Sequence, residues 1–421
     1  AMQAAGVKRG YVCYDKDAGK VLCSHPCLQP ILDMVGEDRI DYDEHEGLFF
    51  QVHNKCLLGA FLWKTNRGQG CGGIRLRKYE SLDQYVRDGI RLAVGMGRKS
   101  ALAGLWWGGG KGVIAYSSDD DIVGEKRKEM LLAYGEFLTS LRGCYVAAED
   151  AGIHVEDIDI VYSRSRYVTC ISPELGGSGN PSVPTALGIA CGMEGALDAC
   201  NMGTLEGKSV AIQGVGNVGD PLITFLLERN VSSIVASEYN PTRLKQMQEK
   251  YSDYPNVAII ATGEDPNAIL YEDVDIVSPC AYGGILNETT VPRIKAKIVC
   301  GAANNQLLNP KTDYGMTEKN IIYCPDFVVN RMGIVTCANE HAGRAGSPME
   351  DPLIAKHFGR EDSNSVFNII QTVIKNAKYD KVSTAQAADQ MANKLASELH
   401  PIFGHRSQDI IKSLIKDKWA N

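Results

Sequence analysis

Two lysines and an aspartate in the first half of the chain are candidates for proton-transfer chemistry. Lys99 and Lys111 are twelve positions apart and flank the stretch SALAGLWWGGG, and Asp150 is the second acid of AAEDAG. A lysine packed among glycines and shielded from water has a lowered pKa, which lets it activate water or stabilise an alkoxide. The alternative is that both lysines are solvated and that Asp150 caps a helix in HVEDIDIVY.

The glycines before Lys111 do not form a phosphate loop. That motif, GxxxxGK[ST], requires a glycine and a hydroxyl at positions that Leu105 and Gly112 occupy here. The stretch is therefore either a structural turn or a place where another group approaches bare backbone. Because it follows a helical segment and precedes the strand-like VIAY, we expect it between elements, at an edge open to a substrate.

A second glycine motif, GVGNVG, lies in the context of a dinucleotide site. A strand is predicted at 209–213, the motif follows it, and a helix follows the motif. Gly214 makes the tight turn, Gly216 lets a pyrophosphate approach the backbone, and Gly219 lets helix and strand pack closely. The other cofactor contacts expected in this loop are Val215, Asn217 and Val218.

The next predicted strand, SSIVASE, bears on which cofactor binds. It ends at Glu238, about 20 residues beyond the glycines, where an acid can hydrogen-bond the adenosine ribose and repel a 2′-phosphate. This favours NAD over NADP, while Arg243 nearby leaves NADP open.

The elements that must position these residues alternate between strands and helices, as in a doubly wound α/β sheet. We expect residues 1–45 to be irregular, 47–63 to form a hairpin, and a helix to run from a cap at Ser81 to about 95–97. Two further strands, in VDIVSPC and AKIVCGA, are predicted to end at the cofactor cleft. The residues expected to edge it are Cys280, Ala281, Asn304 and Asn305.

Composition narrows the class of protein. At 421 residues the chain is long enough for two domains, and a net charge of −7 spread along it argues against nucleic acid or a membrane surface as partner. No stretch approaches the roughly 20 apolar residues of a membrane span, and the first ten residues lack the apolar core of a signal peptide. We therefore expect a cytoplasmic protein that acts on a small molecule.

The cysteines fit the same compartment. Thirteen of them, an odd number scattered along the chain, are typical of reduced thiols rather than of a disulfide framework. Cys23, His25 and Cys27 in CSHPC could seed a metal site, but no second ligand cluster accompanies them, so we expect a surface loop and no metal.

Six motifs in order resemble the glutamate/leucine/phenylalanine/valine dehydrogenase family, and the leucine and phenylalanine members most. They are KSALAGLWWGGGKGVI, AAEDAGIHVEDIDIVYSRSRYVTCISPELGGSGNPS, VAIQGVGNVG, SPCAYGGILN, GAANNQLL and PDFVVNRMGIVTCANE, spread over about residues 45–340.

The resemblance implies an NAD-dependent enzyme that oxidatively deaminates an L-amino acid to a 2-oxo acid and ammonia. It assigns Lys111 as the catalytic lysine, Lys99 as the partner of the substrate carboxylate and Asp150 as the proton shuttle. The glycines before Lys111 would be the wall against which the substrate lies. Thr185 and Asn304 or Asn305 would orient the nicotinamide and the carboxylate.

The resemblance also implies an apolar side-chain pocket. Glutamate-specific members have lysine and serine where this chain has Cys71 and Cys337, so no group here would pair with a side-chain carboxylate, whose burial would cost several kcal/mol. The cysteines are smaller than the leucine and valine typical of leucine enzymes, which leaves room for a bulky or aromatic substrate unless Trp106 or Trp107 fills it. The other pocket positions are Gly72, Ala148 and Ile334.

The implied fold has an N-terminal α/β substrate and oligomerisation domain, a Rossmann domain, and an active site in the cleft between them. We expect the first domain at 1–184, with C-terminal helices from about 365–421 packing back on it, the second at 185–364, and a homo-oligomer. Arg331 and Met332 depart from the family pattern and could add a cation to the site or narrow the cleft. Two alternatives stay open: a related dehydrogenase of an unusual substrate, and an NAD-binding protein without turnover.

Overall fold

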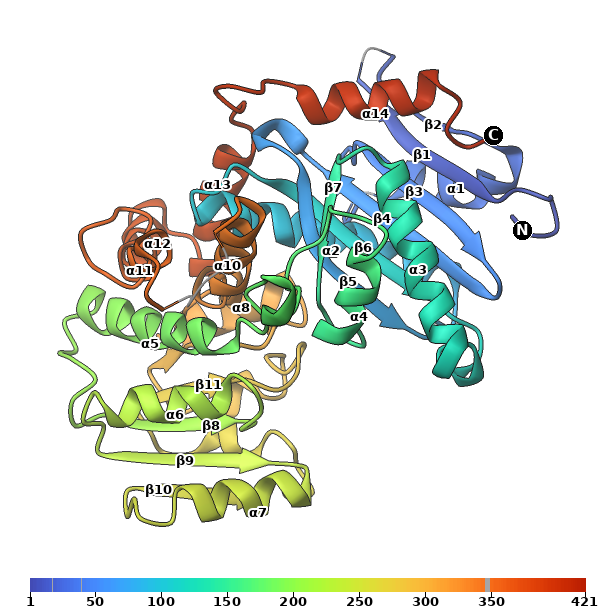
Figure 1. Ribbon diagram of the computed structural model, residues 1–421. Helices are drawn as coiled ribbons and strands as arrows, with labels where there is room; N and C mark the ends of the chain where they lie inside the picture. Colours follow the sequence, from blue (N-terminus) through green and yellow to red (C-terminus); the bar gives the residue numbers. More distant parts are fainter. Residues whose placement is uncertain (17, 39, 345–348) are drawn as a thin grey trace. The chain divides into compact units, whose positions relative to one another are not determined.

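The computed structural model (Figure 1) describes residues 1–16, 18–38, 40–344 and 349–421. The chain divides into two compact units. Unit 1 comprises Ala1–Asn180, Cys337–Gly346 and Ala392–Asn421, and unit 2 comprises Pro181–Thr336 and Ser347–Met391. The expectation of a two-domain α/β protein is confirmed.

Unit 1 is built on a mixed seven-stranded sheet in the order β2-β1-β3-β4-β6-β5-β7. Strands β1 to β4 and β6 pair antiparallel in this order, whereas β5 pairs parallel with β6 and β7. The strands are β1 (Arg9–Asp15), β2 (Lys20–Cys23), β3 (Gly47–His53), β4 (Cys56–Trp63), β5 (Gly70–Arg77), β6 (Gly108–Ala115) and β7 (Tyr145–Ala148).

Two buried clusters cover the two faces of this sheet, because side chains alternate between faces along each strand. Phe49 of β3 packs with one set of helices, whereas its neighbours Leu48 and Phe50 pack with the other. The first set is α3 (Gly124–Ser140), α4 (Val155–Tyr162) and α14 (Arg406–Lys416). The second set is α1 (Gln29–Glu37) and α2 (Leu82–Leu102).

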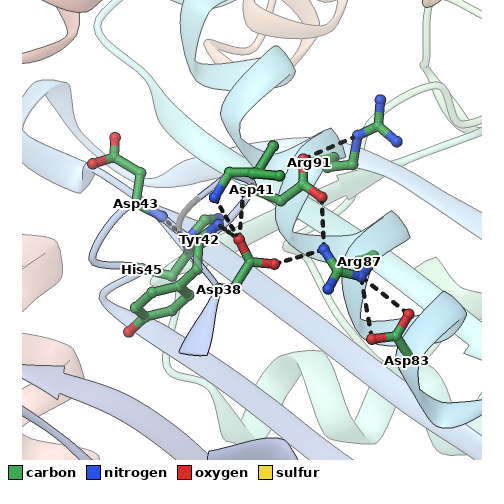
Figure 2. Close-up of polar contacts among 9 residues, drawn as sticks. Asp38, Asp41, Tyr42, Asp43, His45, Asp83, Arg87 and Arg91 are labelled. Carbon is green, nitrogen blue, oxygen red and sulfur yellow. Dashed lines mark hydrogen bonds and ion pairs between the residues drawn. The ribbon is translucent and has the colours of Figure 1, made fainter. Parts of the chain in front are cut away.

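The expectation that residues 1–45 are irregular is wrong. Strand β1 pairs with β3, so that Gly10 lies opposite Phe50, and β2 forms the edge of the sheet. The segment after α1 is bonded to α2, as Figure 2 shows. Arg87 of α2 donates to Asp38 at 2.7 Å and Asp41 at 3.1 Å, and the buried His45 ring lies 2.9 Å from the carbonyl oxygen of Ile90.

Helix α2 begins as predicted but ends later. The Ser81 hydroxyl accepts a hydrogen bond from the amide of Gln84, which confirms the cap. The helix continues through Gly95 and Gly97 to Leu102, because Gly97 allows close packing: a Cβ there would lie 2.6 Å from the Trp63 ring. A glycine that packs against a neighbour does not end a helix.

The glycine stretch is also placed differently from the expectation. Gly108, Gly109 and Gly110 are buried residues of β6, not a linker open to substrate. A Cβ on Gly109 would lie 2.4 Å from the carbonyl oxygen of Ala93 in α2, and one on Gly110 would lie 2.7 Å from the backbone of Gly70 in β5. These glycines therefore let α2 and β5 approach the strand closely.

Unit 2 contains a parallel six-stranded sheet in the order β10-β9-β8-β11-β12-β13. In chain order this is 3-2-1-4-5-6, the arrangement of a Rossmann fold. The strands are β8 (Ser209–Gln213), β9 (Ser233–Glu238), β10 (Val257–Ala261), β11 (Ile276–Pro279), β12 (Ile298–Val299) and β13 (Ile322–Tyr323). The buried strand predicted at 209–213 is confirmed as β8.

Helices complete both units. Those with residues in unit 2 are α5 (Ser182–Ala199), α6 (Gly219–Leu227), α7 (Pro241–Lys250), α8 (Pro310–Glu318), α9 (Asp326–Val329), α10 (Met332–His341), α11 (Pro352–Ala355), α12 (Val366–Asp380) and α13 (Thr384–Ala396). Helix α12, which we expected on the first domain, packs instead against α5 of unit 2. From the C-terminal part of the chain, unit 1 contains the last residues of α10, the last residues of α13 and all of α14. Among the described residues no helix is both long and apolar enough to cross a membrane.

Candidate active site

Lys111 and Asp150 form a buried ion pair in unit 1. Lys111 is 4% exposed on β6, and its Nζ atom lies 2.5 Å from Oδ2 of Asp150, just beyond the end of β7. Burial lowers the pKa of Lys111, although the carboxylate of Asp150 opposes this effect. Burial would raise the pKa of Asp150, but the neighbouring cations outweigh it and hold that pKa well below its usual range. The pair therefore has a proton donor and acceptor in direct contact.

The alternative of a solvated Lys111 and a capping Asp150 is wrong. Lys111 is buried, and the residue that caps α4 is His154, in a capping box with Asp157. Lys99 lies half-buried in the last turn of α2, where the partial negative charge of the helix C-terminus favours a cation.

Arg75 is a component of the site that the sequence did not reveal. Its Nε atom on β5 lies 3.4 Å from Oδ2 of Asp150, the same oxygen that Lys111 approaches. Its Nη1 atom donates to both oxygens of Asp88, at 3.0 and 3.2 Å, and the Tyr79 hydroxyl donates to Asp88 at 2.5 Å. The only signal in the sequence was an arginine beside the glycines of GCGGIR, which is too common to indicate a role.

Glu149, the first acid of AAEDAG, is also perturbed. Burial, the adjacent charge of Asp150 and then that of Glu156 raise the pKa of Glu149 to about 7. The two neighbouring carboxyl groups thus have pKa values shifted in opposite directions: Lys111 and Arg75 lower that of Asp150, whereas burial and negative charges raise that of Glu149.

The two predicted pocket cysteines lie close together within unit 1. Cys71 on β5 is fully buried, and burial and then the neighbouring Cys337 raise the pKa of its thiol well above the usual value. The sulfur of Cys337, on α10, lies 3.2 Å from that of Cys170. Cys170 has a backbone φ of 67°, a left-handed conformation that is uncommon for a residue with a side chain. Cys337 thus contacts the Cys170 thiol and lies within electrostatic reach of Cys71, and Cys170 was not predicted from the sequence.

Glu340 holds the segment that carries Cys170. Its carboxylate, 9% exposed, accepts hydrogen bonds from the amides of Cys170 at 3.1 Å, Ile171 at 3.2 Å and Ser178 at 2.9 Å, and from the Ser178 hydroxyl. A buried carboxylate that accepts four hydrogen bonds is held in one orientation. Glu340 and Cys337 lie about one turn apart on α10. The bonds of Glu340 therefore fix the Cys170 segment, and with it the distance between the Cys170 and Cys337 sulfurs.

The remaining substrate positions of unit 1 lie in or beside its sheet. Gly72 of β5 pairs in register with Ala147 of β7, one residue before Ala148, and Ala148 is buried. Trp107 is 7% exposed and packs against His341 at 5.7 Å, while Trp106 is 41% exposed and stacks under Arg67 at 4.1 Å. One of the two tryptophans is therefore a core residue. Ile334 is buried on α10 in unit 2.

The loop 214–219 of unit 2 has the backbone features expected of a dinucleotide site. Gly214 has a φ of 91°, which favours glycine, and a Cβ on Gly219 would lie 2.0 Å from the Gly214 carbonyl oxygen. Gly216 is exposed, with no atom within 4 Å of a Cβ built there, so a phosphate could approach its backbone. Of the intervening residues, Asn217 is exposed, Val218 half-buried and Val215 buried.

Glu238 lies beside this loop at the end of β9. Its carboxylate accepts from the amide of Val215 at 3.2 Å and from that of Asn240 at 2.8 Å. Arg243 donates to the Val215 carbonyl oxygen and pairs with Asp220 at 3.0 Å. The cation that left NADP open is thus partly neutralised by a neighbouring acid.

The other cofactor positions lie after the strands that were expected to carry them. Cys280 and Ala281 follow β11, and a Cβ on Gly214 would lie 3.0 Å from the Ala281 side chain. Asn304 accepts from Asn330 at 2.9 Å, and the amide of Asn305 donates to Asp326 at 2.6 Å. The Thr185 hydroxyl, near the start of α5, donates to the Pro181 carbonyl oxygen at 2.9 Å.

The expectation that Arg331 adds a cation to the site is wrong. Its side chain is fully buried in unit 2, donates to the Asn364 carbonyl oxygen, and has a pKa that burial lowers to about 9. Met332 is also fully buried and packs against Gly188 of α5. Both substitutions therefore serve packing within unit 2.

The CSHPC segment has no metal-like arrangement. The Cys23 thiol contacts the His25 carbonyl oxygen at 3.5 Å, and the His25 ring contacts Ser24. Across the described ranges no three His, Cys, Asp or Glu side chains gather as a metal site would require, and the thirteen cysteines carry free thiols.

A dinucleotide cradle on one unit and a buried lysine and carboxylate on the other are typical of nicotinamide-dependent dehydrogenases. A family model for glutamate/leucine/phenylalanine/valine dehydrogenase matches residues 176–399, and one for the dimerisation domain of Glu/Leu/Phe/Val dehydrogenase matches residues 60–167. Because the first match covers more than half of the chain, the chain belongs to the glutamate/leucine/phenylalanine/valine dehydrogenase family.

Individual relatives narrow the branch. The leucine dehydrogenase of Geobacillus stearothermophilus is 38% identical over 359 residues, which cover 84% of this chain and 90% of the relative. The valine dehydrogenase of Streptomyces coelicolor is 37% identical over 341 residues, covering 81% and 88%. The structure of L-tryptophan dehydrogenase from Nostoc punctiforme aligns with a TM-score of 0.68 at 29% identity, covering 88% of this chain and 98% of that one. The chain is thus an amino acid dehydrogenase of the leucine and valine branch, in a family that uses NAD or NADP.

Proposed function

We propose that the protein catalyses the reversible, NAD-dependent oxidative deamination of an apolar L-amino acid, branched-chain or aromatic, to the 2-oxo acid and ammonia. The observation that carries this proposal is the buried pair of Lys111 and Asp150, with Nζ and Oδ2 2.5 Å apart. A non-catalytic nucleotide-binding protein has no need to bury a lysine against a carboxylate, an arrangement that costs desolvation energy.

The cofactor, when bound, accepts a hydride from the substrate α-carbon. The chain's own residues then handle protons. Lys111, in its neutral form, takes a proton from the water that attacks the imine carbon, and Asp150 relays protons as the carbinolamine loses ammonia. Lys99 pairs with the substrate carboxylate, and Asn304 or Asn305 and Thr185 orient the reacting groups. The overall reaction consumes amino acid, water and NAD, and releases oxo acid, ammonium, NADH and a proton.

The choice of NAD rests on unit 2. Gly214, Gly216 and Gly219 have the geometry that a pyrophosphate requires, and Glu238 places a negative charge at the end of the second strand. That charge repels a 2′-phosphate, and the pairing of Arg243 with Asp220 weakens the attraction that Arg243 could exert on such a phosphate.

The choice of an apolar side chain rests on Cys71 and Cys337. Both are buried, and in unit 1 they neighbour a third thiol, so a glutamate carboxylate would be buried without a partner. Leucine and valine dehydrogenases are the more identical relatives, and the structure of a tryptophan dehydrogenase aligns over most of the chain, so an aromatic substrate is a second candidate. We further expect a homo-oligomer, since the matched N-terminal model is a dimerisation domain.

The experiment that tests this function is NAD reduction by the full chain with each of the twenty L-amino acids. We expect the largest kcat/KM for leucine, valine, isoleucine or phenylalanine, and at least 100-fold less for glutamate, since an unpaired buried charge costs several kcal/mol. Turnover with glutamate as the best substrate would contradict the pocket, and a protein that binds NAD but reduces it with no amino acid would contradict the function.

A further inference from the structure

The contacts of Arg75 assign it a role that rests on the proposed function of Lys111. We propose that Arg75 is a positioning residue that acts through Asp150 to keep Lys111 able to release its proton at neutral pH, and that Asp88 sets the strength of this effect by partly neutralising Arg75. Arg75 touches neither the substrate nor the cofactor in this role.

Asp150 has two cations beside one of its oxygens. Lys111 Nζ at 2.5 Å and Arg75 Nε at 3.4 Å both approach Oδ2 of Asp150. The three side chains are 5%, 17% and 19% exposed for Lys111, Arg75 and Asp150, so water screens their charges only partly. Two positive charges thus share one carboxylate oxygen in a partly buried place.

This sharing decides where the proton of the pair resides. With Asp150 alone beside it, a buried lysine would hold its proton tightly, because the carboxylate stabilises the ammonium form. A permanently charged guanidinium on the same oxygen weakens that stabilisation and repels the ammonium. Burial and Arg75 both lower the pKa of Lys111, and Asp150 opposes them. A general base takes a proton from water best when its pKa lies near the working pH, and the opposing effects on Lys111 favour such a pKa.

Asp88 of α2 partly neutralises Arg75. It binds Arg75 through both oxygens, at 3.0 and 3.2 Å, and Tyr79 donates to it at 2.5 Å. Its negative charge also raises the pKa of Lys111. Removal of Asp88 should therefore lower the pKa of Lys111, and removal of Arg75 should raise it. A merely structural role would not produce opposite shifts.

The other titratable groups near the pair lie on its neighbouring strands. The Cys71 thiol on β5 lies within electrostatic reach of Lys111, and the Tyr145 hydroxyl on β7 within reach of Asp150. Burial raises the pKa of both groups well above neutrality, so they stay uncharged. Glu149 is a further acid, next to Asp150, and its titration must be separated from that of Lys111.

The test compares Arg75→Gln, Arg75→Lys and Asp88→Asn with the unaltered protein in the pH dependence of kcat/KM for L-leucine at saturating NAD. The acidic limb reports the loss of the Lys111 proton. We expect its midpoint to rise by about one pH unit in Arg75→Gln, to fall by a similar amount in Asp88→Asn, and to return close to the original in Arg75→Lys, which keeps the charge. Glu149→Gln in the same series identifies any limb that belongs to Glu149.

A second readout needs no turnover. Labelling with limiting acetic anhydride at different pH values, followed by mass spectrometry, gives the midpoint of Lys111 reactivity relative to Lys245, whose side chain is 80% exposed. The same opposite shifts are expected, whichever amino acid is the substrate, so a failure of the proposed function and a failure of this inference are distinguishable. If Arg75→Gln does not fold, Asp88→Asn decides alone: a lower midpoint supports the inference. Midpoints that do not move, or that move in the same direction in both variants, overturn it.

Discussion

The Nζ atom of Lys111 lies 2.5 Å from Oδ2 of Asp150, although the two residues are 39 positions apart in the chain. They come from β6 and from the turn after β7, two strands that both flank β5. The sheet of unit 1 therefore positions both side chains. Strand β5 lies between β6 and β7, and its Arg75 approaches the same oxygen of Asp150. The proposed catalytic pair thus depends on strand order rather than on local sequence.

Replacing Lys111 with alanine should abolish turnover and leave cofactor binding intact. Loss of a general base costs about 10²- to 10⁴-fold in kcat, whereas the dinucleotide cradle lies in unit 2. Steady-state kinetics and a fluorescence titration with NADH measure the two effects. Lys128→Ala, on the exposed side of α3, is the matched control. A Lys111→Ala variant that keeps most of its kcat would remove this lysine from the mechanism.

Neutralising Glu238 should weaken the preference for NAD. Glu238→Gln removes the charge that repels a 2′-phosphate and keeps one of the two oxygens that accept from the amides of Val215 and Asn240. We expect the ratio of kcat/KM for NAD to that for NADP to fall about ten-fold, which corresponds to about 1.4 kcal/mol. Glu249→Gln, on the exposed face of α7, should leave the ratio unchanged. Equal kcat/KM for the two cofactors in the unaltered protein would show that Glu238 does not select between them.

Enlarging the two pocket cysteines should shift the substrate preference toward leucine. Cys71→Leu with Cys337→Val fills volume that a larger side chain would use, and one buried methylene is worth about 1 kcal/mol. We expect the ratio of kcat/KM for leucine to that for phenylalanine to rise about ten-fold. Cys56→Val, at a buried thiol of β4, controls for the general effect of replacing a core cysteine. An unchanged ratio in the double variant, with the fold intact, would place the pocket elsewhere.

Acid should destabilise unit 1 through His45 (Figure 2). Burial lowers the pKa of His45 to about 4, whereas an unfolded histidine titrates near 6.5. A depressed pKa gives stability that is present above the unfolded value and is lost as the pH falls through the folded one. Between pH 7 and pH 5 this loss amounts to about 2 kcal/mol.

His45→Gln should remove that part of the pH dependence. Urea unfolding followed by tryptophan fluorescence measures it, since all four tryptophans belong to unit 1. His53→Gln, at a position where β3 is only half-buried, should leave the pH dependence as it was. The same loss of stability in His45→Gln and in the unaltered protein would assign the effect to other groups.

The parts of the fold that the sequence predicted are those with local causes. The strand, glycine turn and helix of the dinucleotide site occupy consecutive residues, so pattern alone predicted β8, the loop from Gly214 to Gly219 and the acid at Glu238. The Ser81 cap is equally local. These predictions needed no knowledge of which strands are neighbours.

The parts that it missed depend on distant partners. Strand β1 is stabilised by pairing with β3, more than 30 residues away, and β2 depends in turn on its pairing with β1. Gly97 and the glycines of β6 looked like breaks, but they are contacts between α2 and the sheet. Arg75 and Cys170 act through residues that only the folded sheet and α10 bring to them, so no motif could indicate them.

The most direct test of the central claim uses α-deuterated L-leucine and L-phenylalanine with NAD and the full chain. The account predicts that each NAD reduced gains one deuterium and is accompanied by one 2-oxo acid and one ammonium ion, measured by mass spectrometry and an ammonia assay. Reduced cofactor without deuterium, or bound NAD that neither substrate reduces, would contradict oxidation at the α-carbon of an apolar amino acid.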